Sequence, residues 1–184
     1  MKTDEKHLKL LLPYYIKEYR NIIPPDLAQE IITQPDLKFH PATAGGGHIS
    51  EARRCYVKSL ESKFKKKISS IFNDIFKSYI HEFKFFEGLK MEDTGYDHLL
   101  YKGSESQEYK EHVDHSQFNK PRILSCSLLL NDDYQGGNFS FFDQEYVISR
   151  MACSAIVFPS NPCFPHAITP VSEGDRHAII SWVH

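Results

Sequence analysis

Apolar residues recur at steps of three and four residues in the first half of the chain. The stripe runs from about Glu61 to Phe83 and consists of Ile68, Ile71, Phe72, Ile75, Phe76, Tyr79, Ile80 and Phe83. This spacing puts the apolar side chains on one face of a helix, and the lysines of "KFKKK" fall on the other face. A solvated helix face explains those lysines better than a phosphate-binding patch does. The pattern predicts one long amphipathic helix that packs on a core.

After Met91 the pattern changes to short runs of branched and aromatic residues separated by Gly, Pro, Asn and Asp. Such runs, spaced by roughly ten residues, predict about eight strands arranged as a sandwich, a barrel or a jelly roll. Upstream, residues 14–23 are expected to form a strand, and "PPDLAQEIITQ" a short helix that begins at its prolines. The fold class is therefore α+β. We expect residues 1–88 to supply a strand and supporting helices, and residues 89–184 to supply the β core.

Between these parts lies "HPATAGGGHISE", with three consecutive glycines at Gly45–Gly47. Three glycines in a row are costly to order inside a regular element, so the sequence indicates a flexible loop. Whether residues 41–52 close over a bound ligand as a lid or only connect two elements stays open at this point.

The composition limits the classes of protein that fit. A chain of 184 residues with 41% hydrophobic residues can bury one core, so we expect a single domain. A formal net charge of −2 gives no indication of nucleic acid or an anionic membrane as a partner. The apolar patch near the N-terminus is too short for a signal peptide and no later run approaches membrane length, which favours a cytoplasmic protein. The sequence does not indicate an oligomeric state.

The four cysteines lack the C-x-x-C spacing of a zinc ribbon or a thioredoxin-like site. They are Cys55, Cys126, Cys153 and Cys163. Small apolar thiols of this kind are usually buried, and in the cytoplasm they stay reduced. We therefore expect reduced and mostly buried thiols.

The segment "YKEHVDHSQ" carries the first candidate chemistry. His112 and Asp114 are two residues apart, so on a strand they leave the same face while His115 points away. A His-x-Asp pair alone arises easily by chance, but His166 and Arg176 follow in a second strand-like region. Two histidines and one carboxylate form the facial set that leaves positions open on a non-haem Fe(II).

Arg176 suits a different task, because a guanidinium binds a carboxylate bidentately and stays charged at any working pH. If "VSEGD" is a hairpin turn, His166 and Arg176 share a face of the hairpin. Their offset along it is then about 13 Å. A five-carbon dicarboxylic acid could chelate the iron at one end and reach the arginine at the other.

The segments "YDHLLYKGSESQEYKEHVDH", "RILSCSLLLNDDYQGGNFSFF" and "FPHAITPVSEGDRHAIISW" together resemble the Fe(II)- and 2-oxoglutarate-dependent dioxygenases, in particular the prolyl-4-hydroxylase-like branch. The resemblance covers residues 90–184 well. It implies a double-stranded β-helix, also called a jelly roll, with His112, Asp114 and His166 as iron ligands. It also implies that Arg176 binds the distal carboxylate of 2-oxoglutarate and that the Tyr101 hydroxyl contacts this co-substrate. Tyr109 either lines a substrate pocket or packs beside it.

By the same resemblance the cofactors are Fe(II), with 2-oxoglutarate and O2 as co-substrates and ascorbate as a further candidate. The reaction implied is hydroxylation of an unactivated C–H bond with formation of succinate and CO2. A prolyl residue in a peptide or protein is the first choice of substrate, and a free amino acid or other small metabolite is the second. The alternative from another class is a non-catalytic metal-binding β-helix module, although such a module has no use for a carboxylate clamp at Arg176.

Overall fold

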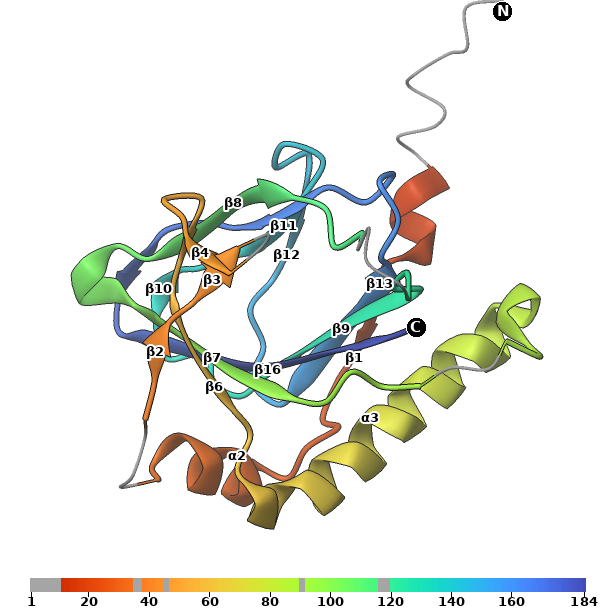
Figure 1. Ribbon diagram of the computed structural model, residues 1–184, viewed down its shortest axis with the longest axis horizontal. Coiled ribbons are helices and arrows are strands. Elements are labelled where there is room, and N and C mark those ends of the chain that lie inside the picture. The colour runs from red at the N-terminus through yellow and green to blue at the C-terminus, as the bar shows by residue number, and fades with distance from the viewer. Residues whose placement is uncertain (1–10, 35–37, 45–46, 90–91, 116–119) are drawn as a thin grey trace, which may run out of the picture.

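The computed structural model describes residues 11–34, 38–44, 47–89, 92–115 and 120–184. Its centre is formed by two antiparallel sheets that face each other, seen end-on in Figure 1. The seven-stranded sheet has the order β1-β13-β9-β16-β7-β6-β2, and the five-stranded sheet has the order β12-β11-β14-β8-β5. In the second half, β7, β8, β9 and β11 alternate between the two sheets, as do β12, β13, β14 and β16, as in a jelly roll. The prediction of a double-stranded β-helix core is confirmed.

The strands of the two sheets come from the whole described chain. The seven-stranded sheet contains β1 (Lys17–Tyr19), β2 (His40–Pro41), β6 (Tyr56–Ser59), β7 (Asp97–Lys102), β9 (Leu124–Leu129), β13 (Ser154–Pro159) and β16 (Asp175–Val183). The five-stranded sheet contains β5 (Arg53–Arg54), β8 (Glu108–His112), β11 (Phe139–Phe141), β12 (Tyr146–Ile148) and β14 (His166–Ile168). Two small pairs are β3 (Thr43–Ala44) with β4 (His48–Ile49), and β10 (Gln135–Gly136) with β15 (Val171–Glu173).

The helices cover the outer face of the seven-stranded sheet (Figure 1). They are α2 (Pro25–Ile32) and α3 (Ser62–Glu82), with single turns of 3-10 helix at Leu12–Tyr15, Lys84–Phe86 and Gly103–Glu105. The predicted amphipathic helix is thus α3, whose buried stripe includes Phe64, Ile68 and Phe72. Lys65 to Lys67 are exposed, so the basic run is a solvated helix face, as the sequence indicated.

The first half of the chain contributes more strands than the sequence showed. Besides β1, three strands of the two sheets lie before residue 89. These are β2 and β6 of the seven-stranded sheet and β5 of the five-stranded sheet. β6 pairs with β7, and β5 pairs with β8, so strands from both halves share one hydrogen-bonded framework. We therefore propose that the two halves form one domain.

The glycine-rich segment was expected to be an irregular loop, but part of it is regular. β3 and β4 form an antiparallel pair in which Thr43 is opposite Ile49. Gly47 adopts a φ of +86°, a left-handed conformation that glycine reaches without strain. Gly45 and Gly46 lie outside the described residues. A role of residues 41–52 as a lid stays a prediction.

Two layers of core result from the alternation of side chains along the strands. Leu128 and Val157 point outward and pack under α2 and α3, whereas Leu129 and Phe158 on the same strands point into the space between the sheets. Burial of each such side chain stabilises the fold by roughly 1.5–3 kcal/mol.

All four cysteines are free, and Cys163 alone among them is exposed. Neither described helix combines the length and apolar character that a membrane-crossing segment needs.

A pair of buried histidines lies on the outer face of the seven-stranded sheet. A hydrogen bond of 3.0 Å joins Nε2 of His98 on β7 to Nδ1 of His177 on β16, and Phe39 packs edge-on against His98. Burial lowers the pKa of His98 to about 2 and that of His177 to about 4. Both imidazoles are therefore neutral in the folded protein at neutral pH.

The metal-free protein should lose stability as the pH falls below about 6.5, the ordinary pKa of histidine. Below that value the unfolded chain protonates both imidazoles, whereas His98 and His177 remain neutral in the fold until about pH 4 or lower. Each histidine then contributes a slope of about 1.4 kcal/mol per pH unit. Urea unfolding between pH 7.5 and 5 in the presence of a chelator measures this. The double variant His98→Leu, His177→Leu should show a shallower slope, and an unchanged slope would contradict the assignment.

Candidate active site

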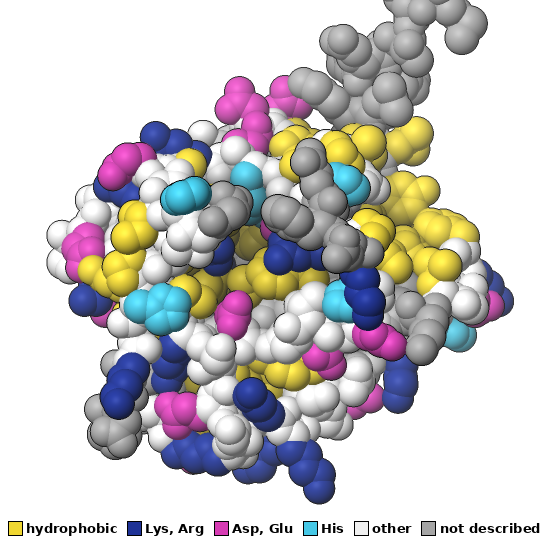
Figure 2. Space-filling view, viewed as in Figure 1, with side chains coloured by type: hydrophobic (Ala, Val, Ile, Leu, Met, Phe, Trp, Pro, Cys, Tyr) yellow, Lys and Arg dark blue, Asp and Glu magenta, His cyan; other side chains and the backbone are white. Residues whose placement is uncertain are grey.

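A pocket opens between the two sheets of the jelly roll. Figure 2 shows a hollow near the centre of the visible face, with hydrophobic side chains at its floor and basic side chains beside it. The apolar part of the lining comes from both sheets and consists of Leu99, Phe139, Phe158, Ile168 and Ile180. The polar part includes all six site residues that the sequence indicated. These six are Tyr101, Tyr109, His112, Asp114, His166 and Arg176.

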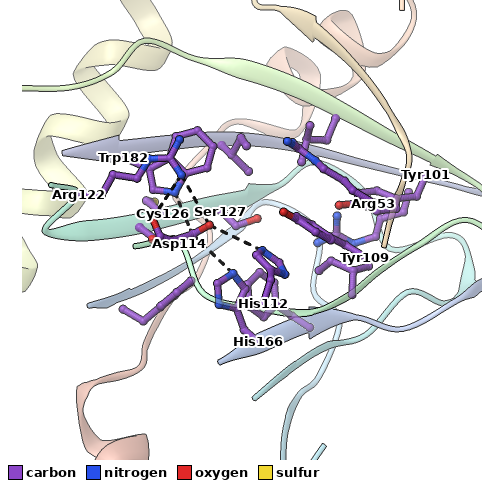
Figure 3. Close-up of a pocket in the computed structure, with 17 residues that line it drawn as sticks. Arg53, Tyr101, Tyr109, His112, Asp114, Arg122, Cys126, Ser127, His166 and Trp182 are labelled. Carbon is purple, nitrogen blue, oxygen red and sulfur yellow. Dashed lines mark hydrogen bonds and ion pairs between the residues drawn. The ribbon is translucent and has the colours of Figure 1, made fainter. Parts of the chain in front are cut away.

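The structure brings His112, Asp114 and His166 together on the five-stranded side of the pocket (Figure 3). His112 ends β8 and lies directly opposite His166, the first residue of β14. Asp114 follows two residues beyond the end of β8, and its carboxylate lies 3.7 Å from His112 Nε2 and 3.6 Å from His166 Nε2. The ligand atoms of all three side chains are within 4.8 Å of one another. One ion can therefore contact all three side chains.

Backbone contacts fix which nitrogen of each histidine is available. His112 Nδ1 donates to the Lys110 carbonyl at 2.9 Å, and His166 Nδ1 donates to the Phe164 carbonyl at 3.0 Å. Because a carbonyl only accepts, the proton of each neutral ring sits on Nδ1. The lone pair of Nε2 is then free on both rings and faces Asp114. A hydrogen bond of this kind also fixes the orientation of an imidazole that binds a metal.

The electrostatics of the three side chains favour the forms that bind metals. Burial acts to raise the pKa of Asp114, but the two imidazoles and hydrogen bonds from Trp182 Nε1 and Ser125 Oγ outweigh it, so the pKa lies below the ordinary value. Burial, followed by His166, lowers the pKa of His112 to about 4. At neutral pH the site thus holds an anionic carboxylate and a neutral His112 imidazole.

These donors fit a non-haem Fe(II) ion by their chemistry. Two imidazole nitrogens and one carboxylate oxygen form one face of a coordination sphere and leave the other positions open. Asp114 Oδ2 already accepts hydrogen bonds from Ser125 at 2.7 Å and Trp182 at 2.9 Å. Oδ1 is then the oxygen that His112 faces and the better placed of the two for an ion.

Arg176 and Tyr101 lie on the other sheet of the pocket. They are directly opposite each other on β16 and β7, with 5.2 Å between the guanidinium carbon and the phenol ring centre. Arg176 is 2% exposed, and its Nε has no hydrogen-bond partner among the described residues. A buried guanidinium that forms no ion pair with a carboxylate of the described residues is a strong site for an anion such as the carboxylate of a ligand.

The interpretation of "VSEGD" as the turn of a hairpin that carries His166 and Arg176 is wrong. His166 lies on β14 of the five-stranded sheet, and Arg176 lies on β16 of the seven-stranded sheet. The intervening "VSEGD" forms β15 over Val171–Glu173 and then a turn at Gly174, whose φ is +69°. The two side chains therefore line one pocket from opposite sheets instead of lying along one face of a hairpin.

Tyr109 lines the pocket and stacks on the metal-site histidine. Its ring centre is 3.5 Å from that of His112, with an angle of 15° between the planes. Residues three apart on a regular strand point to opposite faces, but a bulge in β8 sets Tyr109 and His112 against Ile168 and His166, which are two apart. No local pattern in the sequence indicates this bulge, which is why the position of Tyr109 could not be decided from parity.

Four pocket residues were not recognised as site residues from the sequence. Trp182 donates to Asp114 through Nε1, and Arg122 stacks on its ring at 3.6 Å. Ser125 also donates to Asp114, while Arg53 lies beside Tyr109 (Figure 3). The alternation along the last strand could have revealed Trp182, because it lies six residues after Arg176 and thus on the same face.

Trp182→Phe should weaken metal binding about tenfold to hundredfold without unfolding the protein. Phenylalanine keeps an aromatic ring next to Arg122 but removes the Nε1–H that holds Asp114 Oδ2. The measurement is a titration of the metal-free protein with Co(II), with thermal unfolding as the control for folding. Ser125→Ala removes the other hydrogen bond to Oδ2 and should act in the same direction. Equal metal affinity in the wild type and both variants would contradict this role.

Comparisons with known proteins agree with this geometry. Residues 98–184 match the family model described as the 2OG-Fe(II) oxygenase superfamily. A PKHD-type hydroxylase of Alteromonas mediterranea is 34% identical over 93 residues, which cover 44% of this chain and 39% of that protein. The chain thus spans well under half the length of this curated relative.

Solved structures share the fold over nearly the whole chain. A prolyl-4-hydroxylase of Pseudomonas putida has a TM-score of 0.70 at 18% identity, covering 98% of this chain and 97% of that one. A prolyl hydroxylase of Trichoplax adhaerens, solved with a peptide fragment of the hypoxia inducible factor, has a TM-score of 0.74 at 16% identity, covering 96% and 86%. The match to the 2OG-Fe(II) oxygenase superfamily over residues 98–184 contains every residue that lines the pocket except Arg53, and the jelly roll is shared with the solved structures.

Proposed function

We propose that the protein is an Fe(II)- and 2-oxoglutarate-dependent dioxygenase that hydroxylates an unactivated C–H bond, with a prolyl residue of a peptide or protein as its substrate. The observation that carries the proposal is that one pocket contains both a His-Asp-His set with ligand atoms that face one another and a buried arginine that forms no ion pair with any described residue. A protein that only stored metal would have no use for Arg176. The role of each residue below is part of this proposal.

His112, Asp114 and His166 would hold Fe(II), and Arg176 would bind the distal carboxylate of 2-oxoglutarate, with the Tyr101 hydroxyl as a further donor. When bound, the iron supplies the activation of O2 that is coupled to the decarboxylation of 2-oxoglutarate. The protein positions the reactants and excludes water by its apolar lining. Ascorbate is proposed as the reductant that keeps the iron in its Fe(II) form.

The names of two similar structures support prolyl peptides as the substrate class. One is a prolyl-4-hydroxylase, and the other is a prolyl hydroxylase in complex with a peptide fragment. Tyr109 would form part of the substrate side of the pocket, since it lies between the metal-site histidines and Arg53. A flat aromatic ring beside the iron site suits the face of a pyrrolidine ring.

The test is a turnover assay with Fe(II), 2-oxoglutarate, O2 and ascorbate, in which succinate is measured and peptides with and without proline are analysed by mass spectrometry. The proposal expects succinate to form and a prolyl residue to gain one oxygen atom. Oxidation of a free amino acid with no reaction of any peptide would replace the substrate class. If folded protein with bound iron formed no succinate with any substrate, the chain would instead be a non-catalytic metal-binding module.

A further inference from the structure

Arg53 is a second arginine of the pocket that forms no ion pair with an acidic side chain of the described residues. It lies on β5, directly opposite Tyr109 of β8, with 5.2 Å between its guanidinium carbon and the ring centre of that tyrosine. Its next neighbour, Arg54, points to the other face of the sheet and pairs with Glu108 at 2.9 Å. The positive charge of Arg54 is therefore compensated by Glu108, whereas Arg53 forms no ion pair among the described residues.

The described contacts of Arg53 are all with neutral groups. Its guanidinium donates to the Thr43 carbonyl at 2.8 Å, and its Nε is buried without a hydrogen-bond partner. The neighbouring Cys55 thiol and Tyr109 phenol stay protonated, because burial raises the pKa of each. An arginine that is partly withdrawn from water and lacks a counter-charge is costly, which points to a ligand that supplies one.

The nearby carboxylates are engaged elsewhere or too far away. Asp114 lies 3.9 Å from Arg122, at the opposite end of the pocket from Arg53 (Figure 3). The charge of Asp97 interacts with Arg53, but among the described residues no carboxylate lies within the 4.0 Å of an ion pair with it. Burial raises the pKa of Asp97, and the attraction of Arg53 offsets that only in part.

The charge of the loaded pocket leads to the same conclusion. The charges of Fe(II) and of 2-oxoglutarate are equal and opposite. Binding of both therefore leaves the net charge of the pocket equal to that of its side chains. Three arginines line the pocket, namely Arg53, Arg122 and Arg176, against the single lining carboxylate Asp114. A pocket with such a positive surplus prefers a substrate that carries negative charge.

We propose that Arg53 binds a carboxylate of the substrate and so holds the substrate in the pocket beside Tyr109 and the metal site. This inference rests on the proposed function and specifies its substrate class: a molecule with a carboxylate next to the oxidised ring. Two sources share this chemistry, the α-carboxylate of a free or C-terminal residue and the side chain of an acidic residue next to the target.

The experiment uses the intrinsic fluorescence of Trp182, the one tryptophan of the chain, which lines the pocket. The protein is loaded with redox-inert Zn(II) and saturated with 2-oxoglutarate, so that Arg176 is occupied before the probe is added. The first pair of probes is N-acetyl-L-proline and its amide. The second pair is N-acetyl-Asp-Pro-amide and N-acetyl-Asn-Pro-amide. Within each pair only the carboxylate differs, and the pair that shows a preference identifies its source.

In the wild type, the acid of at least one pair should bind about tenfold to hundredfold more tightly than its neutral partner. Arg53→Gln should abolish this preference, whereas the matched control Arg54→Gln should retain it. Equal binding of acid and neutral probe in the wild type, or no binding of any probe, would overturn the proposal. So would a preference that survives in Arg53→Gln, which would assign the anion to Arg122, or one that is also lost in Arg54→Gln.

The same variants separate this inference from the proposed function. Binding with Zn(II) does not depend on turnover, so a carboxylate preference can be present even where Fe(II)-loaded protein forms no succinate. Conversely, succinate formation with a substrate that carries no carboxylate, unaffected by Arg53→Gln, would leave the dioxygenase in place and remove the role of Arg53.

Discussion

Asp114→Ala should abolish the conversion of 2-oxoglutarate to succinate, a loss of more than about a hundredfold, because changes in residues that merely orient metal ligands already cost ten- to hundredfold. The carboxylate is the one anion of the proposed iron site. Its removal leaves the Nε2 atoms of His112 and His166, which cannot by themselves hold Fe(II) firmly. His112→Ala should have a comparable effect.

A matched control is available one residue before His112. Glu111→Ala removes a carboxylate from the same strand. The Glu111 side chain is exposed and accepts a hydrogen bond from the backbone N–H of Asp143, outside the pocket. This variant should keep the turnover of the wild type. Circular dichroism and thermal unfolding show whether each variant is folded. Full turnover by folded Asp114→Ala with iron supplied would refute the assignment of the metal ligands.

The pH dependence of metal binding follows from the same group of side chains. Asp114 is ionised well below neutral pH and the pKa of His112 is lowered to about 4, so neither has to lose a proton when metal binds near pH 7. A free imidazole, with a pKa of about 6.5, would begin to compete with the metal for protons already in mildly acidic solution. Burial of His112 thus prepares the site before metal arrives.

The convergence of His112, Asp114 and His166 could be predicted from the sequence because its evidence is largely local. His112 and Asp114 are close along the chain, and the run of β-prone residues around His166 predicted that it also lies on a strand. The prediction assumed that Asp114 continues the strand, whereas β8 ends at His112. The two side chains still converge, with 3.7 Å between His112 Nε2 and Asp114 Oδ1.

The contribution of β5 and β6 could not be predicted in the same way. β5 is two residues long, too short for any alternation of apolar and polar positions, and its partner β8 lies more than fifty residues later. Only the long-range pairing of Arg53 with Tyr109 makes it a strand and turns Arg53 toward the pocket. Such pairings depend on the tertiary fold and leave no local signal.

The hairpin expected between His166 and Arg176 failed for a related reason. A turn signal such as Gly174 shows that the chain reverses, but it does not show which sheet the next strand joins. In a jelly roll consecutive strands cross between the sheets. The pairing of Arg176 with Tyr101 instead results from β16 lying between β9 and β7.

Arg176→Gln should raise the KM for 2-oxoglutarate by about a hundredfold to a thousandfold, since two charge-assisted hydrogen bonds to a carboxylate are together worth about 3–5 kcal/mol. Arg176 is 2% exposed and is unpaired at Nε, so water cannot replace the lost contact as it could at a surface. The affinity for Zn(II) should stay near that of the wild type, because Arg176 touches none of His112, Asp114 and His166 in the described contacts.

Arg176→Lys tests whether geometry or charge alone matters. Lysine keeps the charge but loses the bidentate fork, so its KM should lie between those of the wild type and Arg176→Gln. Kinetics at varied 2-oxoglutarate, combined with Zn(II) titration and thermal unfolding, separate a lost co-substrate contact from a damaged fold. A KM that is unchanged in Arg176→Gln would contradict the assignment of this arginine. Loss of Zn(II) binding together with 2-oxoglutarate binding would instead show that Arg176 supports the whole pocket.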